Sequence, residues 1–339
     1  MNGIDVTYKE TGKTYNGLNF YTSQGEIGNA WNHKSPEFDK KYSSTGTNAR
    51  IYVAESGELS GTIVTECEFE IPESCVVNPS DIYTKIPIKT TYTLDKDADY
   101  IKVKVELTNN AKDHWLRVNF PTGIKTEYSY SDSHFDIVKR SIEVPDSTGW
   151  VEQAFGMQPL RTFAEVTDGE NGLAVMPKGL FEYEVFDDMT MALTLIRACR
   201  IKLAVSEEKV TELEDEGVQC PGARSFEYAI HFNKGEIAEL SNKAADIFAN
   251  VKCAVCGRGK GSLPLESSLF EIDNKNVHIT AVKRADDGNG IIVRMFNPTE
   301  DVQKICLEGQ KCKMDETVIG DFDGIIETKK IVTLRLKND

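Results

Sequence analysis

One short phrase of the sequence places two metal-binding residue types close together. His134-Phe-Asp136 sets an imidazole and a carboxylate two positions apart. On a β-strand these side chains would share one face and supply two ligands to a metal ion. The chain holds only 5 histidines, and no third ligand is apparent for this pair. A polar strand face is therefore the favoured interpretation, with a metal site as the alternative.

The eight cysteines offer a second source of metal ligands. Cys253 and Cys256 have the spacing of zinc ligands, but a structural zinc site usually needs a second such pair. Cys306 and Cys312 are spaced more widely than such a pair usually is. Eight cysteines among 339 residues are also too few for a disulfide scaffold. We therefore expect free thiols in a reducing compartment, with Cys253 and Cys256 in a flexible linker.

The other residues that could do chemistry indicate no particular reaction. The sequence has no P-loop and no GxGxxG, GxSxG or HExxH motif. Neighbouring carboxylates such as Glu182 and Glu184 could act as general acid and base. With 54 acidic residues in the chain, however, such pairs are uninformative. Residue types and spacing alone therefore locate no active site.

Alternating apolar and polar residues predict the strands that must position any site. In residues 101–107 every odd position is apolar and every even one is charged, which a strand buried on one face requires. In residues 62–71 the same rule turns Ile63, Cys67 and Phe69 inward. Further runs of this kind occupy 86–94, 277–281 and 332–336. No strand–helix–strand repeat occurs, so we expect an all-β fold of antiparallel sheets.

Three departures from this pattern suggest how the chain is divided. Residues 236–250 have the apolar period of a short helix, and the glycine-rich stretch 253–261 follows them. The acidic stretch 206–217 is interpreted as a solvated loop. We predict a large β domain over 1–235, a helical and glycine-rich connection over 236–261, and a small C-terminal β-sandwich over 262–339.

Charge and hydropathy limit the partners. The 39 basic and 54 acidic residues give a net charge of −15, which argues against a nucleic-acid partner held through its phosphates. No apolar run approaches the roughly 20 residues that a membrane span needs. The first residues have no apolar core that could serve as a secretion signal. We therefore expect a cytoplasmic protein that binds neither nucleic acid nor membrane.

Several phrases, in order along the chain, resemble one enzyme family. Gly25-Glu-Ile-Gly-Asn-Ala-Trp31-Asn-His33 resembles the GE-x-GDAW-x-H segment of bacterial α-mannosidase-like enzymes. Asn109 to Arg117, followed by Phe120 to Ile124, resembles their N-x-AKDHRLRV-x-FPTGI stretch. Further matching phrases lie at 134–140, 168–175, 179–185, 192–197, 221–228 and 331–334. Together they resemble glycoside hydrolase family 38 over nearly the whole chain.

The resemblance is to the C-terminal β region of that family. It implies a large antiparallel supersandwich of the galactose-mutarotase type, a smaller β-sandwich and one short helix in the connection. Family members carry their catalytic zinc, nucleophile and acid/base in an N-terminal barrel and a three-helix segment, which this chain does not contain. The resemblance therefore implies no catalytic residue and no metal here. It also implies a mannoside ligand through the parent enzyme and a catalytic barrel module as partner, and we add a homo-oligomer as a further expectation.

The resemblance also suggests substrate-binding residues. Gly28-Asn-Ala-Trp31 looks like the counterpart of a family loop that offers an aromatic ring to bound mannose, which would make Trp31 and Asn29 substrate contacts. A core anchor at a turn is the alternative for Trp31. Arg140 and Arg117 could bind a substrate carboxylate, or they could pair structurally with Asp136 and Glu143.

Two other functions stay open at this point. The first is a free-standing carbohydrate-binding or scaffold protein on the same fold. The second is a mutarotase-like epimerase, whose chemistry would need a histidine and a glutamate on one concave sheet. His134 and His114 are the candidate histidines, and no glutamate partner can be named from the sequence.

Overall fold

The computed structural model describes residues 2–206, 209–213, 215–249, 251–257, 259–262, 264–268 and 271–336. It divides into two compact units, one of Met1–Tyr130 and Lys139–Gly235 and one of Ser131–Val138 and Glu236–Asp339. All strand pairs described are antiparallel, which confirms the all-β expectation. No helix in the described part of the chain is both long and apolar enough to cross a membrane.

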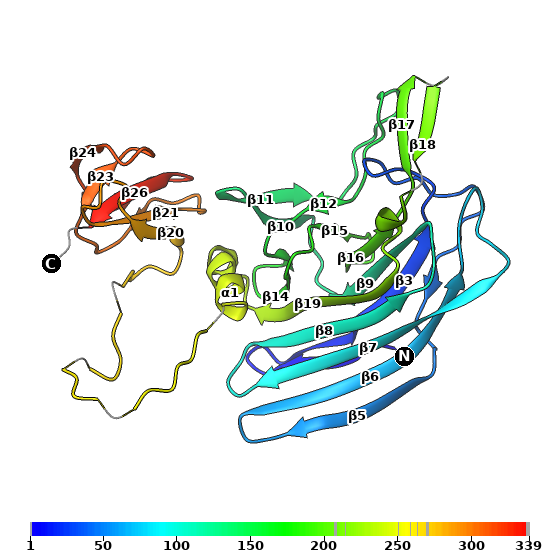
Figure 1. Cartoon of the computed structure of the whole chain (residues 1–339), viewed down its shortest axis with the longest axis horizontal. Coiled ribbons are helices and arrows are strands. Elements are labelled where there is room, and N and C mark those ends of the chain that lie inside the picture. The colour runs from blue at the N-terminus through cyan, green and yellow to red at the C-terminus, as the bar shows by residue number, and fades with distance from the viewer. Residues whose placement is uncertain are drawn as a thin grey trace. The chain divides into compact units, whose positions relative to one another are not determined.

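A nine-stranded sheet spans the first unit (Figure 1). In spatial order its strands are β11 (Asp136–Ser141), β10 (Tyr128–Ser133), β13 (Ala164–Thr167), β14 (Gly172–Pro177), β19 (Gly222–Asn233), β8 (Tyr100–Asn109), β7 (Tyr83–Asp95), β6 (Ser60–Pro72) and β5 (Ala49–Ser56). The predicted runs 62–71, 86–94 and 101–107 form the middle of β6, β7 and β8. Their alternation is confirmed, since Cys67, Phe69 and Val105 are buried.

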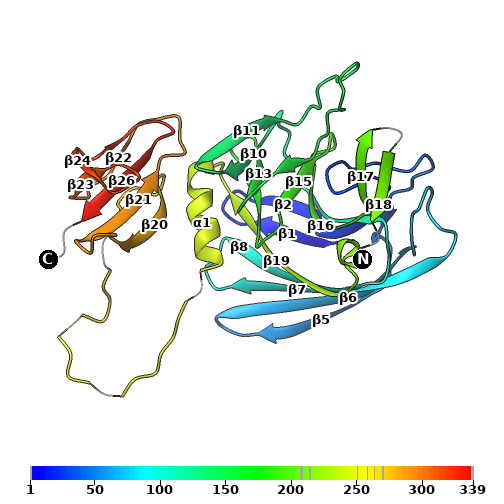
Figure 2. The ribbon, with the colours of Figure 1, turned by 45° about the horizontal axis from the view of Figure 1, so that its top comes forward.

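A six-stranded sheet packs against the nine-stranded one, and two hairpins complete the unit (Figure 2). Its strands are β12 (Gln158–Pro159), β15 (Glu182–Val185), β16 (Thr190–Ala198), β9 (His114–Pro121), β3 (Phe20–Gly25) and β4 (Tyr42–Ser43). The hairpins are β1 (Ile4–Tyr8) with β2 (Lys13–Leu18) and β17 (Ile201–Ser206) with β18 (Lys209–Leu213). Between the sheets, the rings of Phe120 on β9 and Tyr228 on β19 meet edge to face at 5.8 Å. The core of this sandwich is therefore built by the inward row of each strand.

The second unit has its own smaller core. A five-stranded sheet runs in the order β20 (His278–Arg284), β21 (Ile291–Phe296), β26 (Ile331–Leu336), β23 (Gln310–Cys312) and β24 (Val318–Asp321), and β22 (Gln303–Lys304) pairs with β25 (Ile325–Ile326). Val293, Met295 and Leu334 are fully buried between these strands. The predicted helix is present as the single-turn η2 (Ile237–Glu239) and the α-helix α1 (Leu240–Ile247).

The acidic stretch 206–217 differs from its expected form. Lys209–Leu213 is strand β18, and Glu216–Gln219 forms a 3₁₀ turn, η1. Residues 207, 208 and 214 lie outside the described residues. The prediction of a plain loop is wrong, because Lys209–Leu213 pairs with β17 as an antiparallel hairpin.

Candidate functional site

Strand β9 carries a second buried layer on the face turned away from the core. Its inward residues Leu116 and Val118 face the sandwich, while the alternating side chains of Trp115, Arg117 and Asn119 point the other way. These outward side chains are nevertheless buried, with at most 3% of each residue exposed. Loops at this end of the sandwich must therefore cover the outer face of the six-stranded sheet.

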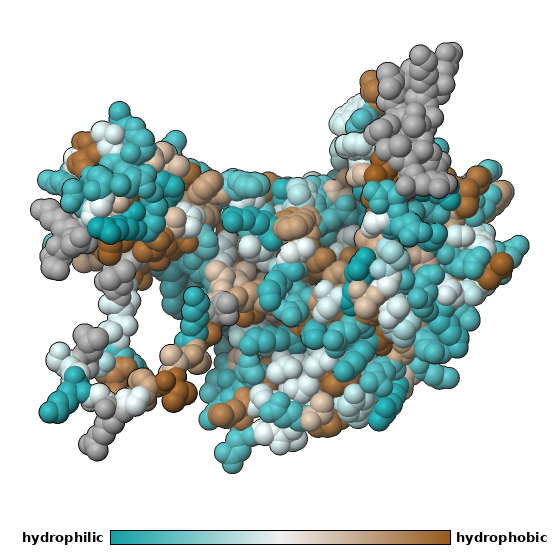
Figure 3. All heavy atoms as spheres, in the orientation of Figure 1, coloured by the Kyte–Doolittle hydropathy of each residue, from teal (hydrophilic) through white to brown (hydrophobic). Residues whose placement is uncertain are grey.

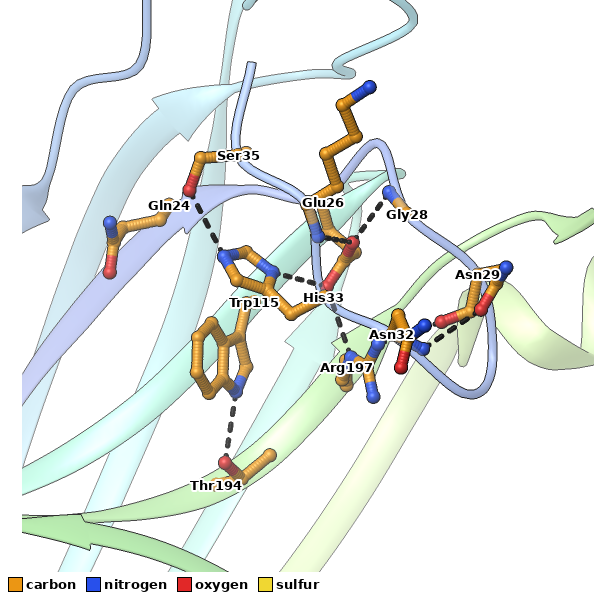
Figure 4. Close-up of polar contacts among 12 residues, drawn as sticks. Gln24, Glu26, Gly28, Asn29, Asn32, His33, Ser35, Trp115, Thr194 and Arg197 are labelled. Atoms are coloured by element: carbon orange, nitrogen blue, oxygen red, sulfur yellow. Dashed lines mark hydrogen bonds and ion pairs between the residues drawn. The ribbon is translucent and has the colours of Figure 1, made fainter. Parts of the chain in front are cut away.

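The loop that follows β3 is fixed by one buried carboxylate. Glu26 is fully buried, and its Oε1 accepts hydrogen bonds from the backbone N–H of Gly28 at 2.7 Å and of Lys34 at 3.2 Å. Its Oε2 lies 2.6 Å from Nδ1 of His33 and accepts from Nε of Arg197 at 3.0 Å (Figure 4). The carboxylate thus joins the two ends of the loop 26–34 to strand β16.

Charge balance explains why an acid is tolerated at this depth. Burial by itself raises the pKa of Glu26, but the hydrogen bond and charge of His33, together with the bonds from Arg197 and Lys34, outweigh it. The pKa therefore lies below its ordinary value, and Glu26 is ionised near neutral pH. The ring of His33 also packs against Trp115 at 4.5 Å between centroids. The loop is consequently held by both charge and ring packing.

Within the loop, Asn29 and Gly28 form the turn that presents Trp31. The side-chain oxygen of Asn29 accepts hydrogen bonds from the N–H of Trp31 and of Asn32, each at 2.9 Å, and its backbone oxygen accepts from Arg197 at 2.7 Å. A Cβ on Gly28 would collide with the carbonyl of Asn32, so only glycine fits there. The structure thus uses the Asn29 side chain inside the turn, and its contact with a sugar stays a prediction.

Trp31 is presented to solvent rather than to the core. The residue is 67% exposed, so the core-anchor alternative is wrong. It lies at a cleft of about 290 Å³. The cleft is lined by Trp31, Asn32, His33, Phe155, Met157, Gln158, Pro159, Phe181, Glu182 and Arg197. Aromatic walls beside a few charged groups are the usual makeup of a site for a sugar-sized ligand.

Arg117 has a structural partner, but not the predicted one. Its guanidinium donates to Glu184 at 2.6 Å and to Gln24 at 2.5 Å, and it stacks on the Trp115 ring at 3.8 Å. The expected pairing with Asp136 or Glu143 is wrong for Arg117, because β9 lies in the other sheet, beside β3 and β16. Burial lowers the pKa of Arg117 against the opposing effect of Glu184.

The His134-x-Asp136 hypothesis also fails on geometry. His134 and Phe135 form the two-residue connection between β10 and β11, and Phe135 has a φ of +59°. The two predicted ligands are therefore not on one strand face. Asp136 instead accepts a hydrogen bond from Lys329 at 2.6 Å. Arg140 lies on β11 and is not among the described residues that line the Trp31 cleft, so its substrate contact stays a prediction.

The cysteines and the other histidine candidate show no arrangement for chemistry. All eight cysteines are free thiols, and Cys253, Cys256 and Cys306 are exposed. Over the residues that the structure describes, no three His, Cys, Asp or Glu side chains converge as metal ligands. His114 is buried between Ser23 and Asn109, and burial lowers its pKa to about 4. It is a neutral hydrogen-bonding residue in this position.

A second hollow lies over the nine-stranded sheet. This shallow groove of about 1160 Å³ runs over β6, β7, β8 and β19. Its charged residues pair across neighbouring strands, as Lys85 does with Glu68 at 2.6 Å and Lys89 with Glu106 at 3.9 Å. Figure 3 shows hydrophilic and apolar side chains mixed over this region. Among the described residues that line it, Phe69 is the only aromatic one and it is buried, so this groove is a weaker candidate than the Trp31 cleft.

Sequence reasoning named Trp31 but missed most of the residues that place it. Glu26 and Arg197 are 171 residues apart in the chain, and alternation reports only which face a residue takes. Both lie inside phrases that carry the family resemblance, which was the available signal. Phe155 and Phe181 were missed because they lie outside the strands, where no periodic pattern marks them, although Phe181 lies inside the matching phrase 179–185.

Two family models match this chain, and a curated relative matches most of its length. The model described as glycosyl hydrolases family 38 C-terminal domain matches residues 3–202, and the one described as glycosyl hydrolases family 38 C-terminal beta sandwich domain matches 276–336. A putative mannosylglycerate hydrolase of Halalkalibacterium halodurans is 29% identical over 325 residues, which are 88% of this chain and 35% of that protein.

Two solved structures share the fold. An alpha-mannosidase from Enterococcus faecalis V583 is 24% identical with a TM-score of 0.90, over 98% of this chain and 40% of its own. A protein in the glycosyl hydrolase family 38 from Enterococcus faecalis is 24% identical with a TM-score of 0.88, over 99% of this chain and 42% of its own. The chain thus spans well under half the length of these relatives.

Proposed function

Since the chain belongs to glycoside hydrolase family 38, as its C-terminal region, we propose that it serves an enzyme that hydrolyses α-mannosides. In this proposal the first unit contributes a sugar contact, and the bond-breaking groups belong to another part of the enzyme. The observation that supports this proposal is the position of Trp31. This residue is 67% exposed and lies beside a cleft, on a loop that the contacts of Glu26 hold in place.

The cleft offers the groups that a pyranose ring needs. The indole face of Trp31 can cover the C–H face of a sugar, and Phe181, which is 64% exposed, supplies a second apolar wall. Glu182 and Arg197 line the same cleft and can exchange hydrogen bonds with hydroxyl groups. Nothing in this set is paired as general acid and base, so binding and orientation are the role we propose for it.

We place the zinc, the nucleophile and the acid/base of a retaining mannosidase outside these 339 residues. The described residues form no three-ligand metal cluster, so the zinc that the family implies does not fit within them. We therefore expect the isolated chain to be inactive on an aryl α-mannoside, with or without added zinc. Zinc-dependent turnover by the pure chain, lost on chelation, would overturn this assignment.

The partner that we propose is a catalytic barrel module. Large apolar side chains line the cleft and are exposed, and exposed apolar surface of this kind tends to mark an interface. They are Trp31 at 67%, Phe155 at 41% and Phe181 at 64%. The relatives have more than half of their length beyond the matched part, enough for such a module. We place the enzyme in the cytoplasm, where the eight free thiols would persist.

The sugar contact can be tested on the chain itself. The three tryptophans give three ¹⁹F signals after labelling with 5-fluorotryptophan, and single substitutions assign them. Methyl α-mannoside should shift the Trp31 signal and leave the signals of Trp115 and Trp150 unchanged. Phe181→Ala, which keeps the Trp31 label in place, should weaken the response while barely changing the melting temperature, because that residue is also exposed. A titration that moves none of the signals, or all three equally, contradicts the assignment.

A sugar-binding protein without catalysis is the second candidate, and one observation favours it. Every residue lining the cleft belongs to the first unit, so the site needs no other module to exist. Adding a separately expressed family 38 barrel and assaying aryl α-mannoside hydrolysis separates the two functions. Hydrolysis that depends on this chain and falls with Trp31→Ala supports the enzyme. Sugar binding without any such gain supports the binding protein.

A further inference from the structure

One edge of the nine-stranded sheet ends in an open strand. β5 pairs with β6 on one side only, and it lies at the lower margin of the first unit in Figures 1 and 2. An edge strand presents a row of backbone donors and acceptors to any chain that can pair with it. The sequence of β5, Ala49–Ser56, contains neither proline nor lysine, the residues that most often protect such an edge.

The inward face of this edge is apolar and uncovered. Ile51 and Val53 are opposite Thr65 and Ile63 of β6, so they continue the face that forms the core further along the sheet. Yet Ile51 is 67%, Val53 65% and Ile63 46% exposed. The opposing sheet ends at β4, which has only two residues, so it does not reach this margin. Ile63 was expected inward and does share that face, but nothing in the described residues buries it.

The strand is complementary to a second copy of itself. In an antiparallel pair, opposite residues share a face, so a twofold axis through Ile51 sets Ala49 against Val53 and Arg50 against Tyr52. The inward row is then wholly apolar. In the outward row each arginine faces a tyrosine, the combination that already occurs within β5 at 4.9 Å. A register shift between Val53 and Glu55 interrupts the ladder, which limits regular pairing to 49–53.

We propose that two copies of this chain associate edge to edge through β5, with Ile51 on the twofold axis, to form one continuous sheet. The alternative axis through Tyr52 is disfavoured, because it would set Arg50 against the irregular position at Ala54. A five-residue ladder is small for an interface, so the dimer should form with a dissociation constant of roughly 1–100 µM. Because each copy has a net charge of −15, added salt should strengthen the association by screening the repulsion between the two copies.

This surface is separate from the one assigned above to a barrel module. The loop that bears Trp31 lies at the upper right of the first unit in Figure 1, whereas β5 lies at its lower margin. Figure 3 shows apolar side chains among hydrophilic ones along that lower margin. The dimer therefore does not depend on the proposed function, and neither result decides the other.

Cysteine cross-linking tests both the dimer and its register. In a background with Cys253→Ser, Cys256→Ser and Cys306→Ser, which removes the exposed thiols, Ile51→Cys should form an intermolecular disulfide under mild oxidation. Val53→Cys is the matched control, because two copies of residue 53 would lie about 13 Å apart, too far for a bond. Mixing Val53→Cys with Ala49→Cys should restore the cross-link between unlike chains.

Solution mass supplies the second readout. The parent chain should move from monomer to dimer between about 1 and 100 µM in light scattering. Ile51→Lys should leave it monomeric over that range with an unchanged melting temperature, while Ile319→Lys in the second unit, also an exposed apolar site, should leave the dimer intact. A parent chain that stays monomeric, a dimer that survives Ile51→Lys, or cross-linking at Val53→Cys but not at Ile51→Cys overturns the proposal.

Discussion

Glu26→Gln should loosen the loop that carries Trp31 while conserving size. The glutamine oxygen can still accept from the backbone N–H of Gly28 and Lys34. Its amide nitrogen, however, would then face Nε of Arg197, which is also a donor. The guanidinium of Arg197 would lose the buried carboxylate that balances its charge. The loop 26–34 would then lose the contact that ties it to strand β16.

The expected cost follows from the burial of the partners. Removing one member of a fully buried ion pair costs about 3–5 kcal/mol. Here the side chains of Arg197 and His33 are 17% and 11% exposed, so water can solvate part of the freed charge. We therefore expect Glu26→Gln to lower the free energy of unfolding by about 2–4 kcal/mol. For a unit of this size, that is a fall of roughly 5–15 °C in melting temperature.

The pH dependence gives the sharper test. Because the folded pKa of Glu26 lies below its ordinary value of 4.5, its stabilisation is complete above that value and disappears as the pH falls through the folded pKa. The difference in stability between the parent chain and Glu26→Gln should thus be constant from pH 7 to about 5 and shrink below 4.5.

Urea unfolding across this pH range measures the difference, and Glu68→Gln is the control. That residue forms an exposed pair with Lys85, so its loss should leave the melting temperature unchanged. A destabilisation by Glu26→Gln of less than about 0.5 kcal/mol at pH 7, or one that persists undiminished at acid pH, would refute the ion-pair argument.

Three further outcomes follow from residues of strand β9 and of the loop that follows β3. Arg117→Lys should cost about 2–3 kcal/mol in urea unfolding, because one ammonium cannot keep both Glu184 and the stacking on Trp115. Burial depresses the pKa of His114 to about 4, so the parent chain should lose roughly 3 kcal/mol of stability between pH 6.5 and 4, and His114→Asn should remove that slope. Gly28→Ala should weaken mannoside binding measured by ¹⁹F titration, since the added Cβ displaces the turn.

The strands could be predicted because alternation reports burial directly. A residue in β8 is apolar when it faces the core and charged when it faces water, so residues 101–107 revealed both the element and its orientation. The same rule misjudged His134 and Asp136, because a two-residue connection interrupts the strand between them. The rule also placed Ile63 on the inward face of β6, which is correct. It could not show that the second sheet leaves this edge of the first sheet uncovered. The periodicity of a sequence shows which face of a strand a residue occupies, but it does not show what packs against that face.

The candidate site was predictable only in its exposed part. Trp31 could be named from a resembling phrase, whereas the contacts that fix it join segments far apart in the chain. Arg197 reaches Glu26 across β16, β9 and β3, an arrangement that depends on the strand order of the six-stranded sheet. That order follows from packing of the whole sandwich, and no local pattern encodes it. For the same reason Arg117 was paired with neighbours in sequence instead of with Glu184.

The two apolar surfaces of the first unit are built differently, and the difference matches the roles proposed for them. A sugar site needs one ring held at a defined angle, because ordering a loose loop would consume much of the small binding free energy of a monosaccharide. The Glu26 network supplies that fixed geometry around Trp31. Pairing of two sheets needs instead a regular row of backbone groups with apolar side chains at every second position, and β5 supplies Ala49, Ile51 and Val53. Substitutions in the network should therefore alter sugar binding and leave the dimer intact, and Ile51→Lys should do the reverse.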